Sequence, residues 1–212
     1  MTTRKTIEHP ILFSGQMVRA ILDGKKSQTR RVVKPQPVCN IPGAYFDKYN
    51  GGPQWNWWTK DNKVCNGHNI FTCPYGKPGD QLWVRETWTP TQVCNSRGIN
   101  IWADSGPVYY KADPKDFQRN FSWKPSIHMP RWASRITLEI TDIRVERVQN
   151  ISEDDAKKEG VNFGVVKCPS GEMTLYARCE FFSLWESINN KRGFGIGVNP
   201  YVWVIEFKRI KP

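Results

Sequence analysis

The chain is organised around Ala20-Ile21-Leu22-Asp23-Gly24-Lys25-Lys26-Ser27-Gln28-Thr29-Arg30-Arg31. Ser14 can cap a helix that runs into this segment, because apolar residues recur from Met17 at i, i+3 and i+4, which is one face of a 3.6-residue period. Gly24 is a residue type that commonly ends a helix in the left-handed conformation. The sequence therefore predicts a short helix that stops at Gly24 and is followed directly by a basic segment.

Residues 25–31, called the basic motif below, contain four cations and three side chains with hydroxyl or amide groups. One interpretation is a solvated helix end, since cations are favoured beside the last carbonyls of a helix. The other is a ligand pocket, because Ser27, Gln28 and Thr29 lie between the cations, and an anionic or base-like ligand needs hydrogen-bonding groups beside positive charge. The mixture of residue types favours the pocket.

Positive charge is concentrated in the first part of the chain. The 212 residues carry a formal net charge of +11, and residues 1–37 hold eight Lys and Arg against two acids, which accounts for +6. Local positive charge attracts phosphate, so RNA, single-stranded nucleic acid or a modified nucleoside is the expected partner. The chain has no apolar run of about 18 residues and no signal-peptide pattern, which predicts no membrane partner and a cytoplasmic location. Six cysteines in such a chain are expected to be reduced thiols.

Residues from about 38 to 79 look like an insertion of loops and short hairpins, rich in Gly, Pro, Asn and Trp without a sustained period. The ten tryptophans either fill a core or, at positions such as Trp57 and Trp58, stack on planar ligands. The spacing of the potential metal ligands in this segment is not typical of a zinc site, so we expect buried, reduced cysteines and no metal or other cofactor. These potential ligands are Cys39, Cys65, His68 and Cys73.

Residues 81–88 alternate with period two and predict a strand in which Glu86 falls on the apolar face. A carboxylate on that face must be paired, because burying it alone is costly. Lys26 or Arg31 could supply the partner; in the other interpretation Glu86 sits at a strand end and reaches solvent. A second irregular segment follows at about residues 90–133.

The clearest strand pattern covers residues 136–145. Ile136, Leu138 and Ile140 alternate with polar residues, and the apolar pattern then resumes at Ile143, one residue out of phase. A β-bulge near Thr141 would restore the register, as barrels often require.

The last quarter of the chain predicts two helices and a strand. Residues 152–160 begin with Ser152 and three acids and end at Gly160, which are helix start and stop signals. Glu159 lies at the negative end of this helix, so it is either exposed or faces a cation elsewhere. Apolar residues at helical spacing follow at 181–188, and an alternating strand at 201–210. We therefore expect one α+β domain over residues 1–212, with a small mixed or antiparallel barrel.

These segments, taken in order, resemble the ASCH domain of the PUA-like superfamily, in particular the versions encoded by bacteriophages and prophages. The resemblance covers about half of the chain. It rests on the helix and the motif from Gly24 to Arg31, on Gly79-Asp80-Gln81-Leu82-Trp83-Val84, on the strand followed by the helix from Ser152 to Gly160, and on the strand from Val202 to Lys208. The resemblance implies a small β-barrel flanked by short helices, with the basic motif lining a cleft that receives RNA or a nucleoside.

The resemblance also implies a possible chemistry. Some small family members are amidohydrolases that remove the acetyl group of N4-acetylcytidine with a lysine, a threonine and a glutamate, which correspond by position to Lys26, Thr29 and Glu159. A threonine hydroxyl can act as a nucleophile when a desolvated lysine takes its proton, and a carboxylate can orient that lysine.

The expected function is therefore nucleic-acid or nucleoside binding in a cleft lined by the basic motif. One alternative is an enzyme that hydrolyses N4-acylated cytidine, with Thr29 as nucleophile, Lys26 as base and Glu159 in support. A second alternative is a phage assembly or interaction protein whose charge serves a protein partner. Outside the catalytic candidates, the residues expected to contact the ligand are Lys25, Gln28, Arg30, Arg31 and Glu86.

Overall fold

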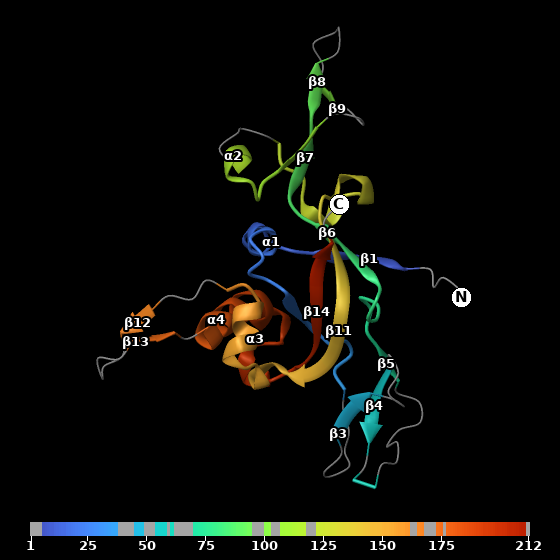
Figure 1. Cartoon of the computed structure of the whole chain (residues 1–212), viewed down its shortest axis with the longest axis vertical. Coiled ribbons are helices and arrows are strands. Elements are labelled where there is room, and N and C mark those ends of the chain that lie inside the picture. The colour runs from blue at the N-terminus through green and yellow to red at the C-terminus, as the bar shows by residue number, and fades with distance from the viewer. Residues whose placement is uncertain are drawn as a thin grey trace.

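A five-stranded sheet forms the centre of the molecule in this computed structural model (Figure 1). The structure describes residues 6–37, 45–48, 54–58, 60–61, 70–94, 100–102, 107–117, 122–161, 165–167, 173–175 and 177–210. The strand order is β1-β6-β11-β14-β2; β1 and β6 run parallel, and the other neighbours are antiparallel. The strands are β1 (Glu8–Leu12), β6 (Gln81–Arg85), β11 (Thr137–Arg147), β14 (Tyr201–Ile210) and β2 (Gln28–Val32).

The predicted bulge is present in β11. The pairing with β14 shifts between Ile140 and Asp142, so that Thr141 is the extra residue. The shift returns the apolar side chains to one face: Leu138, Ile140 and Ile143 are all buried in the same core. Because a bulge also bends its strand, β11 can curve around that core, and Figure 1 shows this curvature.

The sheet separates two cores, and β14 contributes to both. Trp203, Ile205 and Phe207 pack with α1 (Gly15–Leu22) on one face. Val202 and Val204 face the other side, where they pack with α3 (Glu153–Lys158) and α4 (Ala177–Asn189). The alternation of β14 therefore separates two apolar faces rather than an inner face and a solvent face.

The predicted helix signals are confirmed. The Ser14 hydroxyl accepts a hydrogen bond from the Met17 amide (3.5 Å), and Gly24 follows α1 with a φ of +72°. The Ser152 hydroxyl accepts one from the Asp155 amide (3.1 Å) at the start of α3. Among the described residues, no helix is both long and apolar enough to cross a membrane.

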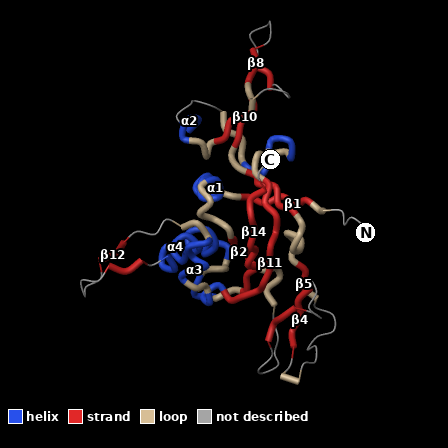
Figure 2. The backbone as a smooth tube through the Cα atoms, in the orientation of Figure 1, coloured by secondary structure: helices blue, strands red, loops and turns tan. Residues whose placement is uncertain are grey.

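Smaller elements lie outside the central sheet, and many of them fall in the two irregular segments, as expected. Figure 2 shows most of them extending away from the central sheet. The strands are β3 (Tyr45–Lys48), β4 (Gln54–Trp58) and β5 (Phe71–Thr72), which form one small sheet, and the pairs β7 (Trp88–Pro90) with β10 (Val108–Tyr110), β8 (Gln92–Cys94) with β9 (Asn100–Trp102), and β12 (Val165–Lys167) with β13 (Met173–Leu175). The short helices are α2 (Pro114–Phe117), η2 (Ser126–His128), η3 (Arg131–Ala133), η4 (Val148–Asn150), η5 (Asn190–Arg192) and η6 (Ile196–Val198).

The fold is thus mixed α+β, as predicted, with most of its regular structure in sheets. Among the described strands the pairings leave β1 and β2 as the two edges of an open sheet. One side-chain hydrogen bond connects these edges, from Arg31 Nη2 on β2 to the Leu12 carbonyl of β1 (2.6 Å).

Candidate functional site

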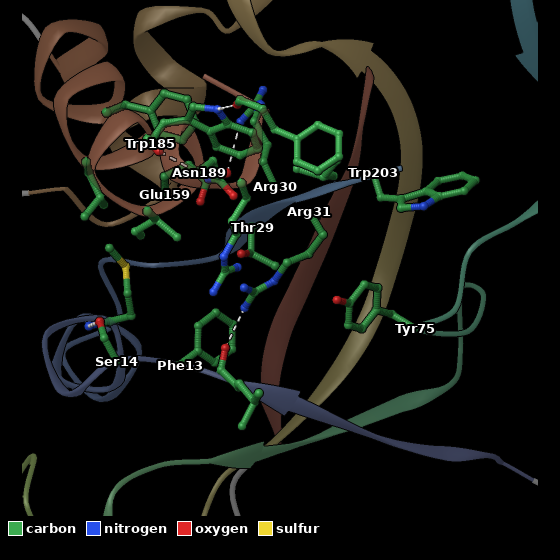
Figure 3. A pocket seen from close by; sticks show the side chains of 18 of the residues that line it. Phe13, Ser14, Thr29, Arg30, Arg31, Tyr75, Glu159, Trp185, Asn189 and Trp203 are labelled. Carbon is green, nitrogen blue, oxygen red and sulfur yellow. Dashed lines mark hydrogen bonds and ion pairs between the residues drawn. The ribbon is translucent and has the colours of Figure 1, made fainter. Parts of the chain in front are cut away.

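A pocket of about 570 Å³ lies between the basic motif on β2, the start of α1 and one face of α4 (Figure 3). In Figure 3 the side chains of Thr29, Arg31 and Tyr75 face the same central space. The lining residues are Pro10, Leu12, Phe13, Ser14, Met17, Lys26, Thr29, Arg30, Arg31, Val32, Lys34, Pro74, Tyr75, Arg85, Glu159, Phe181, Leu184, Trp185, Ile188, Asn189, Arg192, Phe194 and Trp203.

A buried ion pair brings the two ends of the predicted site together. Lys26 Nζ donates to Glu159 Oε2 (2.8 Å) and to the Glu159 backbone carbonyl (2.7 Å), although the two residues are 133 positions apart. Both are almost fully buried, with exposures of 4% and 5%. Glu159 therefore faces a cation and is not exposed, which explains an acid at the negative end of α3.

The local backbone requires a glycine beside this pair. Gly160 adopts a φ of +73°, and a Cβ placed there would lie 2.7 Å from the Lys26 Cβ and 2.9 Å from the Ala20 Cβ. On the other side, the amides of Lys25 and Lys26 both donate to the Ala20 carbonyl, which turns the chain from α1 into β2. The helix stop and the tight approach at Gly160 together place Lys26 against Glu159.

Burial sets the protonation behaviour of Lys26. Desolvation lowers the pKa of Lys26 below its ordinary value, and the neighbouring Glu159 carboxylate opposes this shift only in part. The buried amine is therefore closer to losing its proton than an ordinary lysine, which is a requirement for a general base.

Arg30 is held by three carboxylates. Its guanidinium donates to Glu159 Oε1 (3.2 Å), Glu146 Oε2 (3.1 Å) and Asp155 Oδ2 (3.1 Å), and it lies over the Phe181 ring. Its side chain is completely buried. This geometry gives Arg30 a supporting role, because its charge is already neutralised within the protein.

Arg31 and Thr29 reach the pocket with groups that remain available. The Arg31 guanidinium lies over the Phe13 ring, and its single hydrogen bond to a described residue goes to the Leu12 carbonyl. Burial lowers the pKa of Arg31, with the nearby Tyr75 and Glu159 acting in the opposite direction. The Thr29 side chain lines the pocket beside Lys26 and Glu159.

Three of the predicted ligand contacts lie elsewhere. Glu86 is buried as expected, but it is paired with Arg135 (2.9 and 3.1 Å) and does not line the pocket, so the expected pairing with Lys26 or Arg31 is wrong. Arg135 lies two residues before β11, which pairs with β6, and period-two alternation within one strand cannot indicate a partner from another segment. Lys25 is exposed and pairs with Asp23 (3.5 Å), and Gln28 is fully buried outside the pocket lining.

Several residues that line the pocket were not predicted from the sequence. Trp185 and Ile188 were assigned to an amphipathic helix, which is correct, but part of its apolar face lines the pocket. Arg192 follows that helix, and no pattern in the sequence connects this helix with the basic motif. Trp58 does not line the pocket; its indole N–H donates to the Asp47 carbonyl (3.4 Å). The Trp57 side chain lies outside the described part of the chain.

Of the four potential metal ligands between residues 38 and 79, the structure describes only Cys73. Cys39, Cys65 and His68 lie outside the described residues, and within those described no group of three or more Cys, His, Asp or Glu side chains could hold a metal. Cys73 is buried, and this burial raises the pKa of its thiol to about 12.

Comparison of the chain with protein-family models, with curated proteins and with solved structures finds no match.

Proposed function

We propose that this pocket binds a nucleoside unit, either free or within single-stranded nucleic acid such as RNA. The observation that carries the proposal is the composition of the wall. Among its described residues six are cations and one is an acid, and the same wall contains the rings of Phe13, Tyr75, Trp185 and others. Aromatic rings stack on bases, and cations attract phosphate. The volume of about 570 Å³ falls within the range of about 300–1,000 Å³ that is usual for small-ligand sites.

We also propose that the chain is an ASCH-type member of the PUA-like superfamily and that its central sheet is a curled, barrel-like sheet. The hydrogen bond between Arg31 and Leu12 supports the curl because it joins the two edge strands. A core that contains Ile11 from β1 and Val33 beside β2 supports it as well. The buried pair between Lys26 and Glu159 supports the family assignment, since the resemblance implies that these positions meet.

The binding proposal is tested with a pair of matched variants. Ile188 lines the pocket and is 49% exposed, while Val198 is 62% exposed and outside the lining. Ile188→Glu should weaken binding of a fluorescein-labelled single-stranded RNA about tenfold at low salt, because it adds a negative charge beside the expected phosphate. Val198→Glu makes the same change in net charge and should have little effect. Equal loss in both variants, or binding that does not weaken with salt, would contradict a site in this pocket.

A second candidate function is hydrolysis of the N4-acyl group of cytidine. The observation that favours it is the presence of Thr29 in the same buried wall as the pair of Lys26 and Glu159. In this reaction Thr29 Oγ1 attacks the acyl carbon while neutral Lys26 takes the hydroxyl proton. The C–N4 bond then breaks, and Lys26 returns the proton to the leaving N4 amine. Water subsequently hydrolyses the threonine ester, which releases the carboxylic acid and restores the hydroxyl.

Incubation with N4-acetylcytidine distinguishes an enzyme from a binding protein. Thr29→Val keeps the shape of the side chain and removes the hydroxyl, so turnover should fall at least about 100-fold, whereas Thr29→Ser should retain activity. Turnover that is equal in wild type and Thr29→Val would show that another group, or a contaminant, performs the reaction. Binding of the nucleoside without turnover would leave the first function alone.

A further inference from the structure

We propose that the pocket has a separate phosphate subsite at its rim, formed by Arg31 and Arg192 with Lys34 and Arg85 beside them, so that the preferred ligand is a nucleotide and not a nucleoside. This inference rests on the proposed function and specifies its ligand. It also moves phosphate recognition from the basic motif as a whole to one of its residues and three cations outside it.

The cations of the wall fall into two groups by depth. Lys26 and Arg30 are buried, together with Thr29 and Glu159. Arg31 and Arg85 are half-buried, and Lys34 and Arg192 are exposed. The first group, with Thr29 and Glu159, forms the floor of the pocket, and the second group forms its rim.

The floor cations are already neutralised. Lys26 is paired with Glu159, and Arg30 is paired with Glu159, Asp155 and Glu146. A phosphate placed beside them would face the Glu159 carboxylate, which pairs with both cations, while Asp155 and Glu146 are shared between Arg30 and Arg144 outside the lining. The floor is therefore suited to the neutral, hydrogen-bonding edge of a base, and much less to an anion.

The rim cations have no such partners. Arg31 donates to the Leu12 carbonyl, and Arg85 donates to the Ile127 carbonyl. Neither residue forms an ion pair with a described carboxylate, and the same holds for Lys34 and Arg192. Lys34 lies over the Phe194 ring instead (5.1 Å).

Two further observations support an anion at this rim. Arg31 Nε and Arg85 Nε are buried and have no hydrogen-bond partner among the described residues, although this is also true of Arg30 Nε in the floor. Arg192 lies close enough to Arg31 for their like charges to repel, and this repulsion contributes to the lowered pKa of Arg31. A phosphate between the two guanidinium groups would remove the repulsion and accept charge-assisted hydrogen bonds from both.

The same division sets the direction of the ligand. With the phosphate at the rim, the base extends towards the floor, so its exocyclic group approaches Thr29 and Lys26. The Phe13 ring lies between the two groups, because it is 5.6 Å from Lys26 of the floor and 5.2 Å from Arg31 of the rim. A free nucleotide and a single nucleotide within a single strand can both adopt this orientation, because each consists of a base with an attached phosphate.

The experiment compares nucleosides with their phosphates by titration calorimetry on the full chain at low salt. The ligands are the four common nucleosides and N4-acetylcytidine, their 5′- and 3′-monophosphates, and a short single-stranded RNA. The variants are Arg192→Gln and Lys34→Gln, which are exposed and make no described ion pair. The control is Lys191→Gln, which removes the same charge next to Arg192 but lies outside the pocket lining.

The monophosphate of a bound nucleoside should bind about tenfold or more tightly than the nucleoside itself. This advantage should be largely lost in Arg192→Gln and Lys34→Gln and kept in Lys191→Gln. Nucleoside and monophosphate of equal affinity would overturn the phosphate subsite and leave the proposed function intact. An advantage equally reduced in Lys191→Gln would overturn the assignment to the rim. If neither nucleosides, nucleotides nor RNA bind, the proposed function fails and the subsite with it.

A difference between the monophosphates and the RNA identifies the source of the phosphate. Preference for a monophosphate indicates a free nucleotide, and preference for the RNA indicates a phosphodiester. Both results support the subsite provided that they depend on Arg192 and Lys34.

Discussion

Removal of the Glu159 carboxylate should leave Lys26 as a buried charge without a carboxylate partner. Glu159→Gln removes the ion pair with Lys26 (2.8 Å) and the one with Arg30 (3.2 Å). Arg30 keeps Asp155 and Glu146, so most of the effect falls on Lys26. The Glu159 backbone carbonyl still accepts a hydrogen bond from Lys26 and is unaffected by the substitution.

Breaking a buried ion pair by removing one partner costs about 3–5 kcal/mol of stability. The glutamine amide oxygen remains as an acceptor, so we expect the lower end, about 3 kcal/mol. The double variant Lys26→Met/Glu159→Gln contains neither buried charge and should cost only about 1 kcal/mol relative to wild type, because an apolar replacement of a buried pair is often close to neutral. The double variant should therefore be more stable than Glu159→Gln.

Urea unfolding of the wild type, both single variants and the double variant measures these terms. The effect of pH gives an independent check. Burial lowers the folded-state pKa of Lys26, and losing Glu159 lowers it further. At a pH between this folded-state pKa and the unfolded-state pKa of about 10.5, the unfolded state binds more protons than the folded state. The free energy of unfolding therefore rises with pH in this range. The deficit of Glu159→Gln should thus shrink from pH 7 towards pH 9.5.

Additive effects of the two substitutions would refute this reasoning. A loss below about 1 kcal/mol in Glu159→Gln, or a loss that grows as pH rises, would refute it as well.

Other substitutions test other parts of the fold. Gly160→Ala should lower the free energy of unfolding in urea by about 2–4 kcal/mol, because it combines a left-handed backbone with two close contacts. The control is Gly24→Ala, which should cost only about 1 kcal/mol because Gly24 is also left-handed but has open space around it. Arg135→Met should cost about 3 kcal/mol at pH 7 by leaving Glu86 buried without its cation, and since burial already raises the pKa of Glu86, this loss should diminish as pH falls and Glu86 is protonated. Iodoacetamide at pH 8 should modify the exposed Cys179, whereas Cys73 should react only after unfolding, because it is buried and its pKa is raised to about 12. Mass spectrometry of the native and the urea-treated protein measures the modification of each cysteine. Rapid labelling of Cys73 in the native protein would contradict its burial.

Local signals predicted the parts of the fold that depend on neighbouring residues. Ser14 and Ser152 were recognisable as helix caps because the cap and its partner lie within one turn of chain. The bulge at Thr141 was recognisable because a single extra residue inverts the apolar pattern. Glu159 was recognisable as unusual because an acid is unfavourable at the negative end of a helix unless it faces a cation.

The partners of charged residues could not be predicted in this way. Alternation correctly predicted that Glu86 is buried, but its partner Arg135 comes from the segment just before β11, 49 residues further along the chain. Arg31 of β2 and Arg192 of η5, which follows α4, line the same pocket only in the folded chain. Which cations are neutralised and which remain available is a property of the assembled pocket, and adjacent residues such as Arg30 and Arg31 differ completely in this respect.

Photo-crosslinking of a single-stranded RNA that contains 4-thiouridine tests the central claim most directly, because it identifies the surface that the base contacts. We expect mass spectrometry to find the crosslinks within residues 26–34 and 181–194. At RNA concentrations below saturation, Ile188→Glu should reduce their yield about tenfold, in line with its weaker binding, while Val198→Glu should not. Crosslinks confined to the β3–β5 sheet, or crosslinks in the pocket segments with an unchanged yield in Ile188→Glu, would contradict the claim that this pocket receives the base.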